Sequence, residues 1–346
     1  IGKLDDFIDN IKSIIGDKPV DYLIINHIEP DHSGAVKRFL SEYPKATVVG
    51  NRMMFKFFEA FFGDANQKQM VKEGDTLPLG EHELTFFSTP MLHWPETMMT
   101  YEKTEKVLFS ADVFGSFGTL DGVIFDDETN IEHFENEMRR YYSNIVGKYT
   151  AQTQKALKKL AGVEAKIIAP THGLVWRKHI ETLLSLYDKW SKFETGKGVV
   201  IAYASMYGNT QRMADFIARK LVENGINDIR IYDVSKTHVS YILSDIWKYK
   251  GVILGAPAYD QSNYPNMEHL LNELEIKQAK HHIAGVFGSF LWSGGAVKRI
   301  TGFVENAEWE LVSDSAEIKG SATGTDVEKL ENLAVKMSEK LKKYFD

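Results

Sequence analysis

The segment HIEPDH places four side chains that can bind a metal within six residues. They are His27, Glu29, Asp31 and His32, and they follow the apolar, strand-like segment VDYLIIN (20–26). Pro30 favours an extended backbone at the residue before it, so the side chains at 27, 29 and 31 are expected to project to one side. Asp31 and His32 can then turn towards the opposite side of the same cavity. A single histidine is more often a structural residue, but four candidates in one short segment indicate a metal site.

Three further residues of ligand type stand at the ends of predicted strands. His93 follows the strand 83–89, Asp112 ends the strand 106–111, and His172 follows the strand 165–170. A sheet gathers such residues at one edge, so we expect them to join the first four. The chain has no cysteine. Disulfides, iron–sulfur clusters and thiolate zinc sites are therefore excluded for this sequence, and nitrogen and oxygen atoms have to hold any metal.

A second group of segments is typical of a phosphate-bearing ligand. The segment SMYGNT (205–210) follows the strand 199–205 and opens a helix, where backbone N–H groups and the helix dipole favour a phosphate. The segments GAPAYD (255–260) and GSFLWSGGA (288–296) follow two later strands. All three lie at the carboxyl ends of strands, which is where open parallel sheets bind ligands.

The elements that position these residues divide the chain into two halves. Up to about residue 194, two apolar segments (20–26, 46–51) are typical of buried strands separated by an amphipathic helix that begins near Gly34. Antiparallel-type strands (83–89, 97–103, 106–112), a helical stretch over 131–162, a strand at 165–170 and a helix over 176–194 follow. After the short segment ETGKG (194–198), apolar strands alternate with amphipathic helices, which predicts a doubly wound parallel sheet. We therefore predict two domains, 1–194 and 198–346.

Composition and charge limit the possible functions. The chain has 346 residues and a net charge of −7, from 41 Lys and Arg against 48 Asp and Glu. This acidic balance argues against nucleic acid as a partner, and no apolar run approaches the length of a membrane span. No secretory signal is visible, and the lack of cysteine fits a reducing compartment, so a cytoplasmic location is expected. The sequence does not begin with Met, and we expect a preceding segment.

The order H-x-E-x-D-H, His, Asp, His resembles the metallo-β-lactamase superfamily, and specifically its flavodiiron proteins. The hydrolases of that superfamily usually carry a second His where this chain has Glu29. A carboxylate at that position shifts the preference from zinc towards iron or manganese. The resemblance implies an α/β and α+β chain: a lactamase-like αββα sandwich, whose first strands precede residue 1, followed by a flavodoxin-like sheet.

The resemblance also implies roles for the ligands of a dinuclear, non-haem iron site. His27, Glu29 and His93 would bind the first iron, Asp31, His32 and His172 the second, and Asp112 would bridge the two. The other seven His residues are interpreted as surface or structural, and no catalytic residue is expected beyond the ligands.

The three later loops resemble the FMN loops of flavodoxins. The phosphate loop would comprise Ser205, Met206, Tyr207, Gly208, Asn209 and Thr210. The loops at the flavin ring would comprise Pro257, Ala258, Tyr259 and Asp260 on one side, and Ser289, Phe290, Leu291, Trp292, Ser293, Gly294 and Gly295 on the other. The alanines at 256 and 258, and Leu291, depart from the usual flavodoxin pattern.

The resemblance implies an oxidoreductase that reduces O2 to water or NO to N2O, with FMN passing electrons from an external donor. That donor would be rubredoxin or the reduced deazaflavin F420H2, and the assembly a head-to-tail homodimer or a dimer of dimers. Two alternatives stay open: a zinc hydrolase with a flavin-binding domain, and a pure electron carrier. Glu29 argues against the first, and the cost of assembling seven ligand-type side chains without a metal argues against the second.

Overall fold

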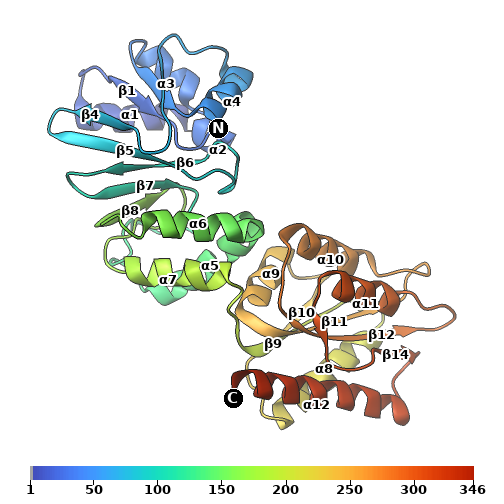
Figure 1. Cartoon of the computed structure of the whole chain (residues 1–346). Coiled ribbons are helices and arrows are strands. Elements are labelled where there is room, and N and C mark those ends of the chain that lie inside the picture. Colours follow the sequence, from blue (N-terminus) through green and yellow to red (C-terminus); the bar gives the residue numbers. More distant parts are fainter. Residues whose placement is uncertain (1–2) are drawn as a thin grey trace. The chain divides into compact units, whose positions relative to one another are not determined.

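The computed structural model describes residues 3–346, which form two compact units (Figure 1). The first unit consists of the residues up to Glu135 together with Ala151–Asp188. The second unit consists of Asn136–Thr150 and Lys189–Asp346. The polypeptide therefore passes between the two units more than once.

The first unit contains a three-stranded parallel sheet of β1 (Tyr22–Ile24), β2 (Thr47–Gly50) and β3 (Lys68–Met70), in that order. In β1 and β2 successive side chains are apolar and point to opposite sides, so these two strands present apolar residues on both faces. Ile24 and Val49 pack towards the second sheet of this unit, while Leu23 and Val48 pack against helices. Those helices are α1 (Leu4–Ile15), α3 (Val36–Glu42) and α4 (Arg52–Phe62).

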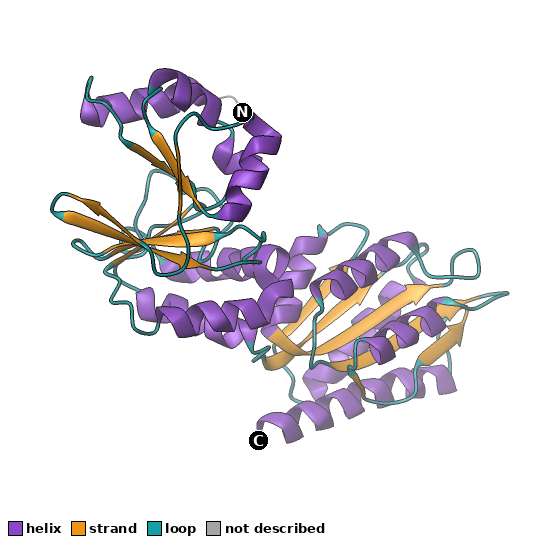
Figure 2. Ribbon diagram, turned by 45° about the horizontal axis from the view of Figure 1, so that its top comes forward, coloured by secondary structure: helices purple, strands orange, loops and turns teal. Residues whose placement is uncertain are grey.

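The second sheet of this unit has the order β4-β5-β6-β7-β8. Its strands are β4 (Thr76–Leu79), β5 (His82–Ser88), β6 (Met98–Glu102), β7 (Val107–Ala111) and β8 (Ile167–Pro170). The first four pair antiparallel and β8 joins β7 in parallel. Helices α6 (Thr150–Leu160) and α7 (Ile180–Ser191) lie beside this sheet, so two sheets are enclosed between helices (Figure 2). The predicted αββα sandwich is confirmed.

The helical stretch predicted over 131–162 is interrupted. Helix α5 (Ile131–Tyr141) leads into a π-helix (Tyr142–Val146) and a short 3-10 helix (Gly147–Tyr149) before α6 begins. The side chains of Ser143 and Asn144 both donate to the carbonyl oxygen of Arg140, which competes with the regular helical hydrogen bonds there. The helix predicted over 176–194 begins only at Ile180, because Asp126 accepts the backbone N–H groups of Arg177–His179 and holds them in a loop.

The second unit contains a parallel sheet with the order β10-β9-β11-β12-β13, and β14 also pairs with β12. Its strands are β9 (Gly196–Tyr203), β10 (Ile229–Asp233), β11 (Tyr249–Pro257), β12 (Ile283–Phe290), β13 (Glu310–Leu311) and β14 (Ala316–Lys319). Helices α8 (Asn209–Glu223) and α12 (Thr325–Phe345) cover one face, where Ile217 and Leu333 join the core. Helices α9 (Val239–Lys248), α10 (Pro265–Lys277) and α11 (Ala296–Asn306) cover the other. The predicted doubly wound sheet is confirmed.

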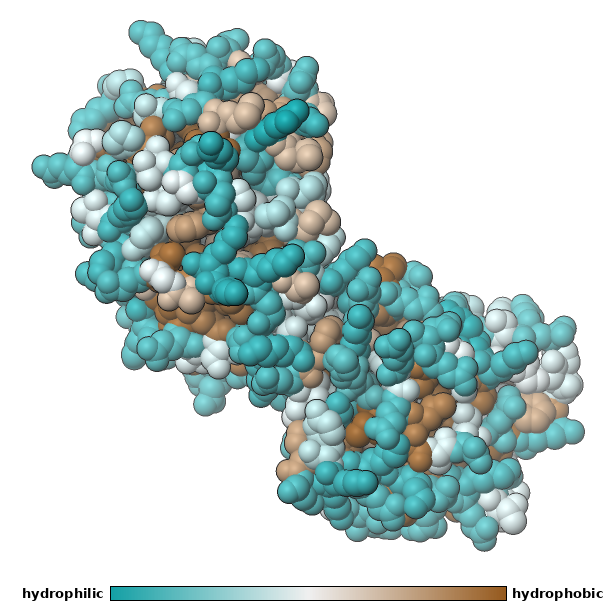
Figure 3. All heavy atoms as spheres, in the orientation of Figure 1, coloured by the Kyte–Doolittle hydropathy of each residue, from teal (hydrophilic) through white to brown (hydrophobic). Residues whose placement is uncertain are grey.

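The surfaces of both units are mainly hydrophilic, with apolar side chains exposed in places (Figure 3). The most exposed aromatic residues include Tyr207 and Trp292, at 87% and 76% of their surface. Within residues 3–346, no helix combines the length and apolar character needed to cross a bilayer.

Candidate metal centre and cofactor loops

The loop after β1 is shaped so that its ligand-type residues separate into two directions. Glu29 precedes the short helix α2 (Pro30–Ser33), which starts with a proline at its first position. Ser33 donates from its backbone to the carbonyl oxygen of Glu29 and from its hydroxyl to that of Ile28, at 2.9 and 2.7 Å. This tight turn places His27 and Glu29 before the helix and puts Asp31 and His32 on it.

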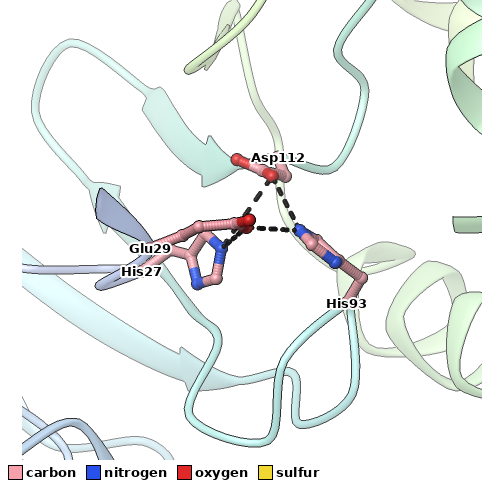
Figure 4. Close-up of side chains that lie close together, drawn as sticks. All are labelled: His27, Glu29, His93 and Asp112. Carbon is pink, nitrogen blue, oxygen red and sulfur yellow. Dashed lines mark hydrogen bonds and ion pairs between the residues drawn. The ribbon is translucent and has the colours of Figure 1, made fainter. Parts of the chain in front are cut away.

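The first group of converging side chains consists of His27, Glu29, His93 and Asp112 (Figure 4). Nε2 of His27 and Nε2 of His93 each lie 3.1 Å from Oε2 of Glu29. Nε2 of His93 lies 3.0 Å from Oδ2 of Asp112. One donor atom from each of the four residues lies within 4.8 Å of all the others, which is the spacing of ligands around one ion.

The second group consists of Asp31, His32 and His172. Oδ2 of Asp31 lies 3.4 Å from Nε2 of His32 and 3.3 Å from Nε2 of His172. The side chains of Asp31 and His172 are 50% and 35% exposed, whereas that of His27 in the first group is 1% exposed. The second group therefore faces solvent more than the first.

Asp112 connects the two groups. Its Oδ2 faces His93, and its Oδ1 lies 2.9 Å from Nε2 of His32. The carboxylate is buried, and its Oδ1 accepts a hydrogen bond of 2.7 Å from the hydroxyl of Thr171. A carboxylate that turns one oxygen to each group is suited to bridging two metal ions.

Neighbouring charged groups in the site shift the pKa values of Asp112 and His27. Burial alone would raise the pKa of Asp112, but its contacts with His32, His93 and Thr171 outweigh that effect and hold its pKa well below its usual range. Burial would lower the pKa of His27, but Glu96, Asp112 and Glu29 together raise it. Without a metal, the cluster therefore favours an anionic Asp112 and a protonated His27, and metal binding would release protons.

The arrangement of the donor atoms suits a metal ion better than it suits hydrogen bonds among the side chains. Among the residues that the structure describes, Nε2 of His32 is buried and has no hydrogen-bond partner. Asp112 Oδ1 is close to it in distance but lacks the alignment of a hydrogen bond. Hard oxygen and imidazole nitrogen ligands, several of them carboxylates, suit iron or manganese. The seven residues together thus fit a dinuclear site, and all seven sequence-predicted ligands lie in it.

Two polar residues next to the site were not singled out from the sequence. Glu96 is fully buried, and its Oε1 lies 2.6 Å from Nδ1 of His27. Thr171 binds Asp112, as described above. Neither residue stands in a distinctive pattern, although each lies within three residues of a ligand: Glu96 follows His93, and Thr171 precedes His172.

The three loops predicted for a cofactor come together at the carboxyl ends of β9, β11 and β12, around a cavity of about 290 Å³. Thr210 and Ser289 join two of the loops through a hydroxyl–hydroxyl hydrogen bond of 3.1 Å. The cavity is lined by Ser205, Met206, Tyr207, Asn209, Thr210, Pro257, Ala258, Asp260, Gln261, Ser289, Phe290, Leu291, Trp292, Ser293 and Gly320. Of the predicted residues, Gly208, Tyr259, Gly294 and Gly295 are not part of this lining.

Two of these glycines nevertheless shape the loops. Gly208 has φ +87° immediately before α8, and its backbone N–H donates to the hydroxyl of Ser205 at 3.0 Å. Gly295 has φ +136°, and a Cβ atom there would lie 2.3 Å from the carbonyl oxygen of Gln261. A helix N-terminus, small residues and hydroxyl groups around one cavity fit a phosphate-bearing flavin. Gln261 and Gly320 line the cavity but were missed from the sequence; Gly320 follows β14, a strand that was not predicted.

Comparison with known proteins agrees with this arrangement. Residues 2–173 match the ODP family beta lactamase, and residues 201–333 match the flavodoxin family. Rubredoxin-oxygen oxidoreductase of Megalodesulfovibrio gigas is 32% identical over 96% of this chain and 83% of its own length. The anaerobic nitric oxide reductase flavorubredoxin of Salmonella typhi is 32% identical over 88% of this chain, which spans 65% of that longer protein.

Solved structures give the same result. The rubredoxin oxygen:oxidoreductase from Desulfovibrio gigas has a TM-score of 0.94 and 31% identity, with 99% of this chain and 86% of that chain covered. The flavodiiron protein from Giardia intestinalis has a TM-score of 0.92 and 25% identity, covering 99% and 85%. The seven converging side chains, the loops around the second cavity and these similarities lead to one conclusion: the chain belongs to the flavodiiron protein family.

Proposed function

We propose that this chain is an oxidoreductase that reduces O2 to water at a non-haem diiron site, with FMN passing electrons from an external donor. The observation that carries the proposal is the position of Asp112, which turns one carboxylate oxygen to each of two ligand groups. When bound, the iron pair and FMN would supply Lewis acidity and the electrons of a four-electron reduction.

The roles of the ligands follow the two groups. His27, Glu29 and His93 would hold the first iron, and Asp31, His32 and His172 the second, with Asp112 between them. His27 and Asp112 of the first group are buried, whereas Asp31 and His172 of the second group are 50% and 35% exposed, so a small gas molecule would enter from the side of the second group. The ring of Trp94 lies edge-on to His27, with 5.3 Å between the ring centroids, and packs over the first group.

The second unit would bind FMN in the cavity at the ends of β9, β11 and β12. Ser205–Thr210 would hold the phosphate at the N-terminus of α8, and the loops after β11 and β12 would flank the ring. In functional terms we assign residues 1–194 to the diiron domain and 198–346 to the FMN domain. The assignment of the seven converging residues as metal ligands is part of this proposal. So is the assignment of the loop residues as FMN contacts.

Reduction of NO to N2O is the alternative at the same site. It is favoured by the similarity to a nitric oxide reductase flavorubredoxin, and it needs two electrons for each pair of NO molecules. A zinc hydrolase is the alternative of another class. Glu29 argues against it, because a hard carboxylate in the first group favours iron over zinc.

The electron donor and the assembly belong to the proposal as well. The name of the M. gigas relative supports rubredoxin as the donor, and F420H2 is the alternative. A head-to-tail homodimer, or a dimer of such dimers, would bring the FMN of one chain to the irons of another. Tyr207, Leu291 and Trp292 are exposed side chains of the proposed FMN loops, and such an interface would cover them. The cytoplasmic location stays a prediction.

The test begins with protein purified without oxygen and without chelator. We expect about two irons and one FMN per chain, followed by consumption of O2 with a reduced rubredoxin as electron source. Faster consumption of NO than of O2 under the same conditions would favour the alternative reductase. Zinc that added iron cannot replace, together with no consumption of either gas, would overturn the proposal and favour the hydrolase.

A further inference from the structure

Glu96 is a buried carboxylate that touches the first ligand group without belonging to it. We infer that Glu96 is a positioning residue that orients His27 and lowers the reduction potential of the first metal relative to the second. The inference rests on the proposed diiron centre and concerns only how this chain differentiates its two metals.

The contact fixes which nitrogen of His27 faces the metal. Nδ1 of His27 lies 2.6 Å from Oε1 of Glu96, and Nε2 lies 3.1 Å from Oε2 of Glu29. Both neighbours are carboxylates, which accept hydrogen bonds, and the contact of Nδ1 with Glu96 is the shorter of the two. With a metal ion on Nε2, the remaining proton of His27 would reside on Nδ1, where Glu96 accepts it. Nε2 then presents its lone pair to the first group, as a metal ligand requires.

Glu96 is itself held from several directions. Its Oε1 accepts a second hydrogen bond of 3.1 Å from the backbone N–H of Ile28. Its backbone carbonyl oxygen accepts from Nδ2 of Asn51 at 2.5 Å. Oδ1 of Asn51 in turn accepts from the backbone of Met53 and Met54 and caps α4. The carboxylate therefore has little freedom to leave His27.

The burial of Glu96 points towards a positive charge nearby. Its side chain is fully buried, and among the described residues its Oε2 atom has no hydrogen-bond partner. A buried anion with so few hydrogen bonds is costly unless a cation compensates it. The ring of His27, protonated or carrying a metal on Nε2, would provide that cation, so Glu96 acts through His27.

The groups that contact the ligands would differ between the two metals. A carboxylate on the far nitrogen makes a histidine ligand more basic, which stabilises the higher oxidation state of its metal. On the side of the second group, Oδ1 of Asp112 accepts a hydrogen bond from the neutral hydroxyl of Thr171, which withdraws electron density from that oxygen. The first metal would thus be harder to reduce than the second.

The test compares iron-loaded Glu96→Gln with the unchanged protein. Glutamine keeps the shape of the side chain and an oxygen that accepts from His27, but it removes the charge. We expect the midpoint potential of the first iron to rise in a redox titration followed by electron paramagnetic resonance. Each tenfold change in the preference for ferric over ferrous iron corresponds to about 59 mV for one electron. Competition with a chelator should show iron bound about 10- to 100-fold more weakly.

Two further variants complete the design. Glu96→Asp keeps the charge at a longer distance from His27, so its potential should lie between those of the unchanged protein and Glu96→Gln. Glu83→Gln is the matched control, because the side chain of Glu83 is 41% exposed and lies near the start of β5, at the end away from the loop that carries His93. It should leave the potential and the iron affinity unchanged. Circular dichroism and the FMN content check that each variant is folded.

The outcomes separate this inference from the proposed function. Unchanged protein that binds no iron would contradict the diiron proposal before Glu96 is tested. Unchanged protein with two irons, together with a Glu96→Gln variant whose potential and affinity equal those of the Glu83→Gln control, would overturn the inference alone. A weaker affinity with no change in potential would also overturn it, since that result indicates a structural role. If Glu96→Gln does not fold, Glu96→Asp decides: a raised potential supports the inference and an unchanged one contradicts it.

Discussion

Oδ1 of Asp112 lies 2.9 Å from Nε2 of His32, yet the two atoms lack the alignment of a hydrogen bond. The other oxygen of the same carboxylate lies 3.0 Å from Nε2 of His93. Contacts with both imidazoles and with Thr171 hold the pKa of Asp112 well below its usual range, so an anionic carboxylate turns one oxygen to each ligand group. Asp112 would therefore be a ligand shared by the two metals.

Replacement of Asp112 should therefore affect both metals at once. In Asp112→Asn the amide nitrogen cannot ligate a metal as the carboxylate oxygen does, and the charge that offsets two dications is lost. We expect the iron content to fall from about two towards zero per chain, with both ions lost together, as measured by elemental analysis after gel filtration.

Asp127→Asn is the control for this prediction. Asp127 makes a partly exposed ion pair with Arg177, and such pairs contribute little. Iron content should match that of the unchanged protein. Retention of one tightly bound iron in Asp112→Asn would contradict the shared role of Asp112.

Glu29 should determine the choice of metal. Its Oε2 lies 3.1 Å from two imidazole nitrogens of the first group, so Glu29→His would give that group a third imidazole in place of a carboxylate. Imidazole suits zinc, whereas the hard carboxylate favours iron. After reconstitution with equal amounts of both metals, the ratio of zinc to iron should rise in Glu29→His. An unchanged ratio would show that other ligands set the preference.

The convergence of the ligand-type residues could be predicted because they follow recognisable strands. The strands themselves are apolar and short, as in Val199–Tyr203, whose side chains are buried or nearly so on both faces of a parallel sheet. Asp112 directly follows β7, and His93 lies in the loop after β5, which runs parallel to β7 two strands away, so the convergence of the two side chains at one sheet edge follows from topology. Most of the candidate site could therefore be predicted from the types of the ligand residues and the order of the strands.

The features that escaped prediction depend on contacts distant in sequence. Glu96 reveals its role only through His27, which lies 69 residues earlier. The start of α7 depends on Asp126, more than fifty residues away from Arg177–His179. Gly320 reaches the flavin cavity through β14, a strand of four residues that has no strong apolar run. Neither local propensity nor spacing encodes such contacts.

His282 should make the stability of the second unit depend on pH. Its side chain is buried, neither ring nitrogen has a hydrogen-bond partner among the described residues, and it packs against Trp309 at 4.6 Å between ring centroids. Burial, together with the charge of Lys250, lowers the pKa of His282 to about 3. The unfolded chain takes up this proton near pH 6.5, so stability is complete above that pH and falls as the pH decreases towards 3.

His282→Phe should remove this dependence and keep the aromatic contact. Between pH 6 and pH 5, the unfolding free energy of the unchanged protein should fall by up to about 1.4 kcal/mol more than that of the variant. Urea denaturation, followed by a spectroscopic signal of the second unit, measures this difference. His133→Phe, at an exposed position, serves as the control and should retain the slope of the unchanged protein. Equal slopes in all three proteins would refute the prediction.

Gly295 should be required for FMN binding. It has φ +136°, which L side chains rarely adopt, and an added Cβ would lie 2.3 Å from the backbone oxygen of Gln261. Gly295→Ala therefore forces apart two loops that meet at the flavin cavity, and the loop that contains Gln261 cannot yield without moving its backbone. We expect the dissociation constant for FMN, measured by quenching of flavin fluorescence, to rise by about tenfold or more, since backbone strain of this kind costs about 1–3 kcal/mol.

Gly302→Ala is the matched control in the same region. Gly302 lies within α11, has no atom within 4 Å of an added Cβ, and should gain helix stability when it becomes alanine. Its affinity for FMN should stay unchanged while the melting temperature rises slightly. If Gly295→Ala instead binds FMN as tightly as Gly302→Ala does, the close approach of the two loops is not what holds the cavity in shape.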